Sequence, residues 1–378
     1  MIPYGRQDIS EDDIEAVVAV LRSDWLTQGP ATERFEREFA DYCGTKHAVA
    51  VSSATAALHI ACLSAGLGRG DSLWTSPNTF VASSNCALYC DAEPDFVDID
   101  PSTGNMSAAK LEEKLEQTEK IPKIIVPVHF AGQSCEMEKI AQLSKKYGFI
   151  VIEDASHAAG GKYRGIPIGS CSFSDMAIFS FHPVKIVTTG EGGMVLTNRD
   201  DLYEKLIRLR SHGITRNPAF MEMNEGSWYY EQIELGYNYR MTDIQAALGS
   251  SQMRRLDEFV KRRHALAKRY EEKLSGLPLV PLKQLHDAHS SHHLYVVRLD
   301  AAKRRKVFEA LRAAGIGVNV HYIPVHLQPY YRELGFEEGE FPEAEKYYSE
   351  AITLPLYPSM TDLQQDHVVQ SLSDALRQ

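Results

Sequence analysis

The stretch Asp175-Met-Ala-Ile-Phe-Ser-Phe-His-Pro-Val-Lys185-Ile-Val-Thr-Thr-Gly-Glu-Gly-Gly193 places a lysine just after an apolar run and just before a glycine-rich turn. The apolar run is typical of a buried strand. A lysine at the tip of such a strand loses hydration, which lowers its pKa and leaves more of its amine neutral and able to attack a carbonyl carbon. Lys185 is therefore the candidate for Schiff-base chemistry, with a surface lysine that closes a strand as the alternative.

The run Tyr147-Gly-Phe-Ile-Val-Ile-Glu153-Asp154-Ala-Ser-His157-Ala, upstream of this lysine, is typical of a short buried strand and ends in two carboxylates. Ligands of open α/β sheets collect at the carboxyl ends of strands, so both acids are candidates for site residues. Neighbouring residues of a strand face opposite ways, and only one of the two acids can face a given pocket. We assign that place to Asp154; the alternative is an aspartate that caps a following helix.

A third segment, Lys46-His-Ala-Val-Ala-Val-Ser-Ser53-Ala54-Thr55-Ala56-Ala-Leu-His, changes from a strand pattern to helical composition at residues 52–55. Exposed N–H groups at a helix start, together with the helix dipole and the hydroxyl of Thr55, suit a phosphate group. The small residues of this turn let a phosphate approach closely. An ordinary serine or threonine helix cap explains the same pattern.

Short apolar runs alternate with helical stretches up to about residue 210, which predicts an α/β fold with a mostly parallel sheet covered on both sides by helices. The expected strands lie near 48–52, 72–76, 94–98, 123–129, 149–153, 176–181 and 193–197. A strand over 293–299 and a helix over 301–314 begin a smaller α+β unit. We therefore divide the chain into a large domain with an N-terminal arm (1–240), one long connecting helix (241–275) and a small C-terminal domain (276–378).

The charge balance argues against some kinds of partner. The 378 residues include 40 basic and 51 acidic side chains, for a formal net charge of -11, and they form no dense Lys/Arg block. Nucleic acid is therefore not expected as a partner. The six cysteines show no metal-ligand spacing and the amino terminus lacks the blocks of a signal peptide, so we expect no metal site and a cytoplasmic protein.

Two uncharged runs are long enough to be compared with a membrane span. Residues 47–68 contain no Asp, Glu, Lys or Arg, but they hold three serines, a threonine and two histidines, and the turn at 52–55 divides them. Residues 72–90 include Pro77, Asn78 and Asn85 and fail the same test. We expect no membrane span.

The turn, the acid and the lysine follow one another in an order that is found in a known group of enzymes. The chain resembles the fold-type I enzymes that use pyridoxal 5'-phosphate (PLP), and within them the DegT/DnrJ/EryC1/StrS family of sugar aminotransferases. The similarity runs from Tyr4 and the Trp25-Leu26-Thr27-Gln28-Gly29-Pro30 segment to Leu354-Pro-Leu356. Its most specific segments are Ser53-Ala54-Thr55-Ala56, Thr75-Ser-Pro-Asn-Thr-Phe80-Val-Ala, Glu153-Asp154-Ala-Ser-His157, Phe179-Ser180-Phe-His-Pro-Val-Lys185, Gly190-Glu-Gly-Gly193 and Gly236-Tyr-Asn238-Tyr-Arg240-Met-Thr-Asp243.

The resemblance implies PLP as the cofactor, with pyridoxamine 5'-phosphate as its amino form. Lys185 would carry the cofactor, and Asp154 would keep its ring nitrogen protonated so that the ring withdraws electrons. Asn238 would reach the cofactor phosphate of a neighbouring subunit, which implies a homodimer with two shared sites. The other implied cofactor contacts are the phosphate-binding residues Ser53, Ala54 and Thr55, the stacking ring of Phe80, and His157 and Ser180.

Within the family, the chain is most similar to the branch that aminates C4 of a UDP-sugar on the way to pseudaminic acid. This similarity rests on the sequence around Lys185, on the Asp-Ala-Ser-His157 pattern and on Arg210-Ser-His212-Gly213. Many relatives have Gln in place of His157. The implied acceptor is UDP-2-acetamido-2,6-dideoxy-β-L-arabino-hexos-4-ulose, and the implied donor is L-glutamate. Another nucleotide-linked 4-ketosugar, or a 3-ketosugar, is the alternative.

The resemblance also places a set of residues in the sugar-nucleotide cleft, where aromatic rings would stack on uracil or pack on the sugar. The set is Tyr4, Asp24, Trp25, Leu26, Thr27 and the segment of Val320, His321, Tyr322, Ile323, Pro324, Val325 and His326. Rim packing is the alternative for the aromatic members. Arg240 would either fix its loop or meet a carboxylate of glutamate, and His182 would pack locally.

In the implied mechanism, Lys185 takes a proton from Cα of glutamate and later returns one to C4 of the sugar. Burial and nearby cationic groups are expected to lower its pKa toward neutrality. A PLP-dependent sugar dehydratase of the same fold would carry histidine in place of this lysine. A non-catalytic sugar-nucleotide sensor would have no need for Asp154, Lys185 and the phosphate turn together, so the sequence favours an aminotransferase.

Overall fold

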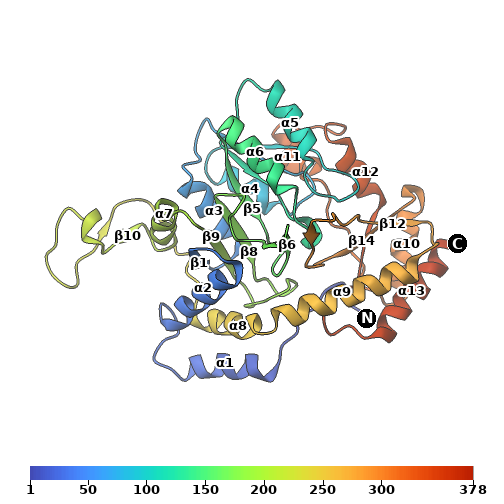
Figure 1. The fold of residues 1–378 in the computed structure, drawn as a ribbon, viewed down its shortest axis with the longest axis horizontal. Coiled ribbons are helices and arrows are strands. Elements are labelled where there is room, and N and C mark those ends of the chain that lie inside the picture. Colours follow the sequence, from blue (N-terminus) through green and yellow to red (C-terminus); the bar gives the residue numbers. More distant parts are fainter. Residues whose placement is uncertain (378) are drawn as a thin grey trace.

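A seven-stranded sheet forms the centre of the computed structural model, which describes residues 1–377 (Figure 1). Four neighbouring pairs are parallel, and β9 alone runs antiparallel to both of its neighbours, β8 and β1. The strand order is β1 (His47–Val51), β9 (Gly193–Thr197), β8 (Met176–Ser180), β5 (Ile150–Asp154), β4 (Ile124–Val126), β2 (Ser72–Thr75) and β3 (Glu93–Phe96). The predicted mostly parallel sheet and the positions of its strands are confirmed.

Helices cover both faces of this sheet because the inner strands are apolar on both sides. One face packs against α3 (Ala54–Ser64), α4 (Ala82–Leu88) and α7 (Asp200–Arg210). The opposite face packs against α5 (Ala108–Gln117) and α6 (Met137–Tyr147) at one end and α2 (Pro30–Cys43) at the other. The uncharged run over 47–68 is thus a strand followed by a helix. Within residues 1–377, no helix is long and apolar enough to cross a membrane.

The connection between the two halves of the chain is two helices, not the single helix that was predicted over 241–275. Helix α8 (Asp243–Met253) and helix α9 (Leu256–Leu274) are interrupted at Arg254 and Arg255. Arg255 has φ -108° and ψ 3°, outside the α-helical range. The two helices run one after the other beneath the molecule, with α1 (Glu11–Leu21) packed along α8 (Figure 1).

A three-stranded antiparallel sheet organises the C-terminal unit. It consists of β12 (Leu279–Pro281), β14 (Tyr295–Leu299) and β15 (Ala351–Leu354). Helices α9, α10 (Ala301–Ala313) and α13 (Asp362–Arg377) pack on it through a separate apolar cluster. The predicted strand and helix of this unit are confirmed. Other short helices are α11 (Pro329–Glu333), α12 (Pro342–Glu350) and the 3₁₀ segments Phe130–Gly132, Pro218–Phe220 and Val325–Leu327.

The first residues of the chain pair with the C-terminal unit. The N–H of Ile2 donates to the carbonyl of Gly315 at 2.8 Å, and the N–H of Leu356 donates to the carbonyl of Tyr4 at 3.0 Å. An added Cβ at Gly317 would lie 2.9 Å from the carbonyl oxygen of Ile2, so this close approach requires glycine. The first residues of the N-terminal arm, which was assigned to the large domain, therefore contact the C-terminal unit; the boundaries at 240 and 276 remain a prediction.

Two small sheets complete the fold, and neither was predicted. Strands β6 (Lys162–Tyr163), β7 (Ile166–Pro167) and β13 (Ala288–His289) join residues from both halves of the chain. Strands β10 (Ile214–Thr215) and β11 (Glu231–Gln232) form a hairpin that projects away from the body of the molecule (Figure 1).

Candidate active site

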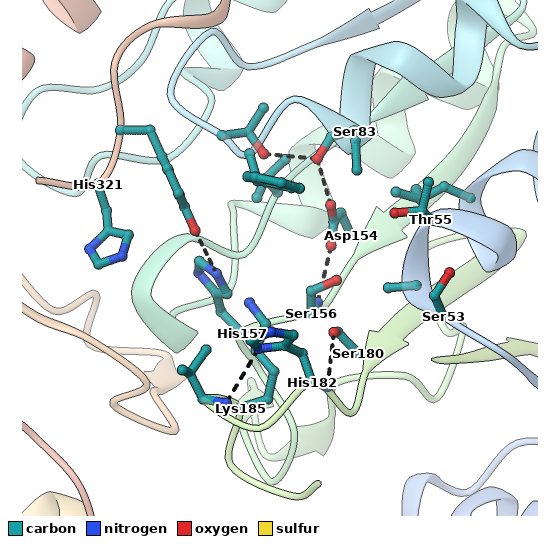
Figure 2. A pocket seen from close by; sticks show the side chains of 18 of the residues that line it. Ser53, Thr55, Ser83, Asp154, Ser156, His157, Ser180, His182, Lys185 and His321 are labelled. Carbon is teal, nitrogen blue, oxygen red and sulfur yellow. Dashed lines mark hydrogen bonds between the residues drawn. The ribbon is translucent and has the colours of Figure 1, made fainter. Parts of the chain in front are cut away.

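A cavity of about 530 Å³ lies at the carboxyl ends of the parallel strands β5 and β8. It brings together residues from the N-terminal arm, the large domain and the C-terminal unit. The predicted site residues that line it are Tyr4, Ser53, Ala54, Thr55, Phe80, Asp154, His157, Ser180, Lys185 and Tyr322. Figure 2 shows Ser53 and Thr55 on the side of the cavity opposite His321.

Lys185 lies in the turn that follows β8, where its N–H donates to the carbonyl of His182 at 2.9 Å. Burial lowers the pKa of its amine to about 8, while the negative charge of Asp154 acts in the opposite direction. The expected contribution of nearby cations to this shift was wrong, because burial alone produces it. A substantial fraction of the amine is therefore neutral close to physiological pH.

Asp154 ends β5 and turns its carboxylate into the cavity wall. Its Oδ2 accepts a hydrogen bond from Ser83 Oγ at 2.6 Å, and its Oδ1 accepts one from the N–H of Ser156 at 3.1 Å (Figure 2). Glu153 faces the other side of the sheet, where it bonds to His129 Nε2 at 2.7 Å. The two acids therefore alternate across the strand, as strand geometry requires.

The N-terminus of α3 forms another wall of the cavity. Ser53 caps this helix by accepting from the N–H of Ala56 at 3.1 Å, and the first N–H groups of a helix have no acceptor within the helix. Gly193 on β9 lies so close that an added Cβ would be 2.5 Å from the carbonyl carbon of Ser53. Glycine at position 193 therefore allows the turn at residues 52–55 to lie close against the sheet. This turn is the one that suits a phosphate.

The ring of Phe80 is 60% exposed although it lines the cavity. An aromatic ring that is left this open offers a flat apolar surface for another ring. The amine of Lys185, the carboxylate of Asp154, the helix start at Thr55 and the ring of Phe80 match the aldehyde, pyridine nitrogen, phosphate and ring face of PLP. The groups present therefore fit this cofactor.

Two histidines that line the cavity stay uncharged. His157 Nε2 lies 3.2 Å from the hydroxyl of Tyr322, and burial, followed by the neighbouring Lys185 and His321, lowers the pKa of His157 well below its usual range. His321 Nδ1 lies 2.8 Å from Thr353 Oγ1, and burial followed by the charge of Lys185 lowers its pKa to about 3. Both imidazoles therefore act as neutral groups.

Some predicted substrate residues do not reach the cavity. Val325 and His326 are fully buried in the apolar cluster behind it, and His326 Nε2 lies 2.9 Å from Glu345 Oε1. The 3₁₀ segment turns these side chains away from the cleft, so their predicted substrate contacts were wrong. Ile323 and Pro324 also lie outside the lining, the former exposed and the latter buried.

Two other predicted segments lie on the surface of this chain, outside the cavity. Residues 24–27, with Asp24, Trp25, Leu26 and Thr27, are exposed, and Thr27 pairs with Thr242. Asn238 is exposed and pairs with Ser211. Their roles therefore remain predictions. Arg240 does not line the cavity either; it pairs with Val51.

The cavity also contains residues that the sequence had not indicated as site residues. Ser83 is the most informative of them, because it bonds to Asp154 and lies 2.8 Å from Thr79 Oγ1. A hydroxyl one helical turn after the Pro77-Asn78-Thr79-Phe80 turn was the available signal. The others are Leu58, Thr79, Ala82, Val128, Ser156, His182, Val184, Glu191 and Asn319; Val320 and His321, which also line the cavity, belong to the segment predicted for the sugar-nucleotide cleft. Residues 1–377 contain no cluster of three or more His, Cys, Asp or Glu side chains that could hold a metal ion.

Comparison with known proteins agrees with this geometry. The family model of the DegT/DnrJ/EryC1/StrS aminotransferase family matches residues 7–373. The chain belongs to this family. It is 41% identical to the spore coat polysaccharide biosynthesis protein SpsC of Bacillus subtilis, over 100% of this chain and 97% of that protein.

Solved structures of family members share the complete fold. The putative sugar aminotransferase Spr1654 of Streptococcus pneumoniae, in its pyridoxamine phosphate form, has a TM-score of 0.92 and 33% identity, covering 100% of this chain and 99% of that one. PseC of Helicobacter pylori, an aminotransferase involved in the biosynthesis of pseudaminic acid, has a TM-score of 0.92 and 30% identity with the same coverage. The protein is a PLP-dependent sugar aminotransferase, which confirms the predicted fold class, enzyme class and cofactor.

Proposed function

We propose that this aminotransferase transfers the amino group of L-glutamate to C4 of a UDP-linked 4-keto-6-deoxy-N-acetylhexosamine. The product would be UDP-4-amino-4,6-dideoxy-N-acetyl-β-L-altrosamine, a precursor of pseudaminic acid. The main support for an amination reaction is that Lys185, Asp154 and the start of α3 line the same cavity. The choice of sugar is supported by the similarity to PseC over the full chain.

Different residues of the chain have different roles in the reaction. Bound PLP supplies an aldehyde and an electron-withdrawing ring. Lys185, with a pKa of about 8, removes the proton from Cα of the donor and delivers one to C4 of the sugar. Asp154, held by Ser83, keeps a negative charge opposite the ring nitrogen. The N–H groups at Thr55 bind the phosphate, so that the ring stays in register with the lysine.

We further propose that the enzyme works as a homodimer with shared sites. Asn238 is exposed on its own chain and lies beyond the walls of its own cavity, which suits a contact with the cofactor phosphate of a second copy. The neighbouring hairpin exposes large apolar side chains, including Trp228 at 70% and Leu235 at 74%. Such side chains are typical of a surface that a partner covers. The six free thiols suit a reducing cytoplasm as the place of action.

A second candidate is the same chemistry on another nucleotide-linked ketosugar. The similarity to SpsC, whose name refers to spore coat polysaccharide, favours it, because that identity of 41% exceeds the 30% identity to PseC. A D-series 4-ketosugar or a 3-ketosugar would be the substrate in that case.

Incubation with glutamate and a panel of ketosugars tests the choice. The panel contains the UDP-linked β-L-arabino 4-ketosugar, its D-series isomer, and dTDP-linked 4-keto and 3-keto sugars. We expect amination of the first compound with the highest kcat/KM, and NMR of the product reports the position and configuration of the new amine. Turnover of only a dTDP-linked or a 3-keto compound would contradict the proposal and favour the second candidate.

A further inference from the structure

The segment Ser291–His293, between β13 and β14, passes directly behind His157 without lining the cavity. Ser291 Oγ donates to the carbonyl of His157 at 2.9 Å. The ring of His293 lies against the ring of His157, with centroids 4.5 Å apart and planes tilted by 45°. The second half of the chain thereby forms the wall behind a residue of the cofactor cavity.

Contacts with α9 and with Gly132 hold the segment Ser291–His293 in place. Arg263, buried in α9, donates from Nη1 to the carbonyls of His292 and His293, each at 3.2 Å. Gly132 lies so close that an added Cβ would be 2.5 Å from Ser291 Oγ and 2.9 Å from the nitrogen of His293. The ring of His293 therefore has little freedom to move away from His157.

The two ring nitrogens of His157 have different surroundings. Nε2 lies 3.2 Å from the hydroxyl of Tyr322, whereas Nδ1 is buried and has no hydrogen-bond partner among the described residues. Leaving a buried N–H without an acceptor costs more than leaving a bare ring nitrogen. The neutral ring therefore carries its hydrogen on Nε2, on the side of Tyr322.

We propose that His293 is a positioning residue of this active site: by packing on the ring of His157 it helps to keep the unpaired Nδ1 away from water, and so holds that ring neutral with its hydrogen on Nε2. The inference rests on the proposed assignment of the cavity to PLP. A ring held in this way directs its N–H to Tyr322 and brings no positive charge to the cofactor cavity. A small side chain at position 293 would open Nδ1 to water and allow a second proton to bind there.

The charged groups that face His157 favour the same state. Burial is the largest cause of its lowered pKa, and the neighbouring Lys185 and His321 add to it. Tyr322, which lies at Nε2, is a neutral hydroxyl whose pKa burial raises. Exposure of Nδ1 would remove part of the burial and would therefore raise the pKa of His157.

His293 stays uncharged as well. Its pKa is lowered well below the usual range by burial first, and then by His157, Lys185, Arg263 and His321. It therefore packs on His157 as an uncharged aromatic ring, and phenylalanine is the substitution that keeps this property.

NMR of histidine ring nitrogens in the cofactor-free wild-type protein provides the first test. His157→Gln identifies the signals of His157. We expect the hydrogen on Nε2 and no titration between about pH 5.5 and 8. A hydrogen on Nδ1, or a titration in that range, would overturn the inference. Because no cofactor is present, this result is independent of the proposed function.

Affinity for PLP, measured by absorbance, provides the second test. We expect His293→Ala to weaken binding about tenfold near pH 6 and less near pH 8, and His293→Phe to stay within about threefold of wild type. The matched control is His292→Ala, which should stay within about threefold of wild type. This buried neighbour packs on His264, with ring centroids 4.6 Å apart, and not on His157.

A double-mutant comparison separates positioning from general stability. In a His157→Gln background, His293→Ala should cause no further loss of PLP affinity, because its effect acts through His157. An equal loss with and without His157, or the same loss in His292→Ala, would overturn the inference. If His293→Ala does not fold, the wild-type NMR measurement still decides.

Discussion

Lys185 brings to the cavity an amine that can react near physiological pH. With a pKa of about 8, half of the amine is neutral at pH 8, compared with roughly one part in three hundred at the ordinary value of 10.5. We predict that borohydride reduction fixes PLP to Lys185, detected by mass spectrometry of peptides. Lys185→Ala should lose at least about a thousandfold in transamination rate. A fully active Lys185→Ala protein would contradict the assignment.

The same lysine should make stability depend on pH in the cofactor-free protein. Its pKa is about 8 when folded and near 10.5 when unfolded, so the unfolded state binds more protons between these values. The penalty for burying the charge is complete below pH 8 and disappears as the pH rises to 10.5. We predict that the free energy of unfolding of wild type, minus that of Lys185→Met, increases from pH 7 to pH 10 in urea titrations. A constant or falling difference would show that the amine is not buried as described.

The hydrogen bond from Ser83 to Asp154 should matter for the cofactor. Ser83→Ala removes a donor to a buried carboxylate, and we predict about tenfold weaker binding of PLP in an absorbance titration. Ser84→Ala is the matched control, because this neighbouring hydroxyl lies 2.6 Å from Tyr331 Oη. The control should bind PLP within about twofold of wild type. Equal losses in both variants would point to a general effect on α4.

The sequence was informative for site residues at the ends of strands and at a helix start. Lys185 and Asp154 follow apolar runs, and strand alternation separates Asp154 from Glu153 without any tertiary information. The signal for Ser83 was weaker, a hydroxyl one helical turn after residues 77–80, because a serine among small helical residues does not by itself indicate an acid on a distant strand. The error at His326 arose because a 3₁₀ turn rotates that side chain into the core.

The contact between β9 and the start of α3 sets the depth of the phosphate-binding turn. Gly193→Ala would place a methyl group 2.5 Å from the backbone of Ser53, and overpacking of this kind costs about 1–3 kcal/mol. We predict lower thermal stability and weaker PLP binding in this variant. Gly68→Ala is the control, since no atom lies within 4 Å of its added Cβ and its φ is not in the left-handed region. A PLP affinity equal to wild type in Gly193→Ala would show that the turn has room to move.

Helices and strands were predictable wherever they were long and apolar. The antiparallel direction of β9 was not, because residue composition carries no information on strand direction. The interruption at Arg254 and Arg255 was missed because the charged helical pattern continues through it. The two-residue strands β10 and β11 are shorter than any pattern that periodicity can reveal.

The proposed homodimer allows a test with two inactive chains. Mixed dimers of Lys185→Ala and Asn238→Ala chains would contain one site with both substitutions and one site with neither. Random mixing makes half of the dimers mixed, so we predict about a quarter of the wild-type activity after joint refolding. If Asn238 acts in its own chain instead, mixing restores no activity beyond that of the parents.

Residues far apart in the chain close the cavity, since Tyr4 and Tyr322 both line it and Ile2 is held by Gly315. During translation, Lys185 leaves the ribosome well before the segment that ends at Tyr322. A nascent chain therefore exposes this lysine to water for a time, with the ordinary pKa near 10.5 and a protonated amine. Only the late arrival of the second half of the polypeptide completes the burial that makes the amine reactive.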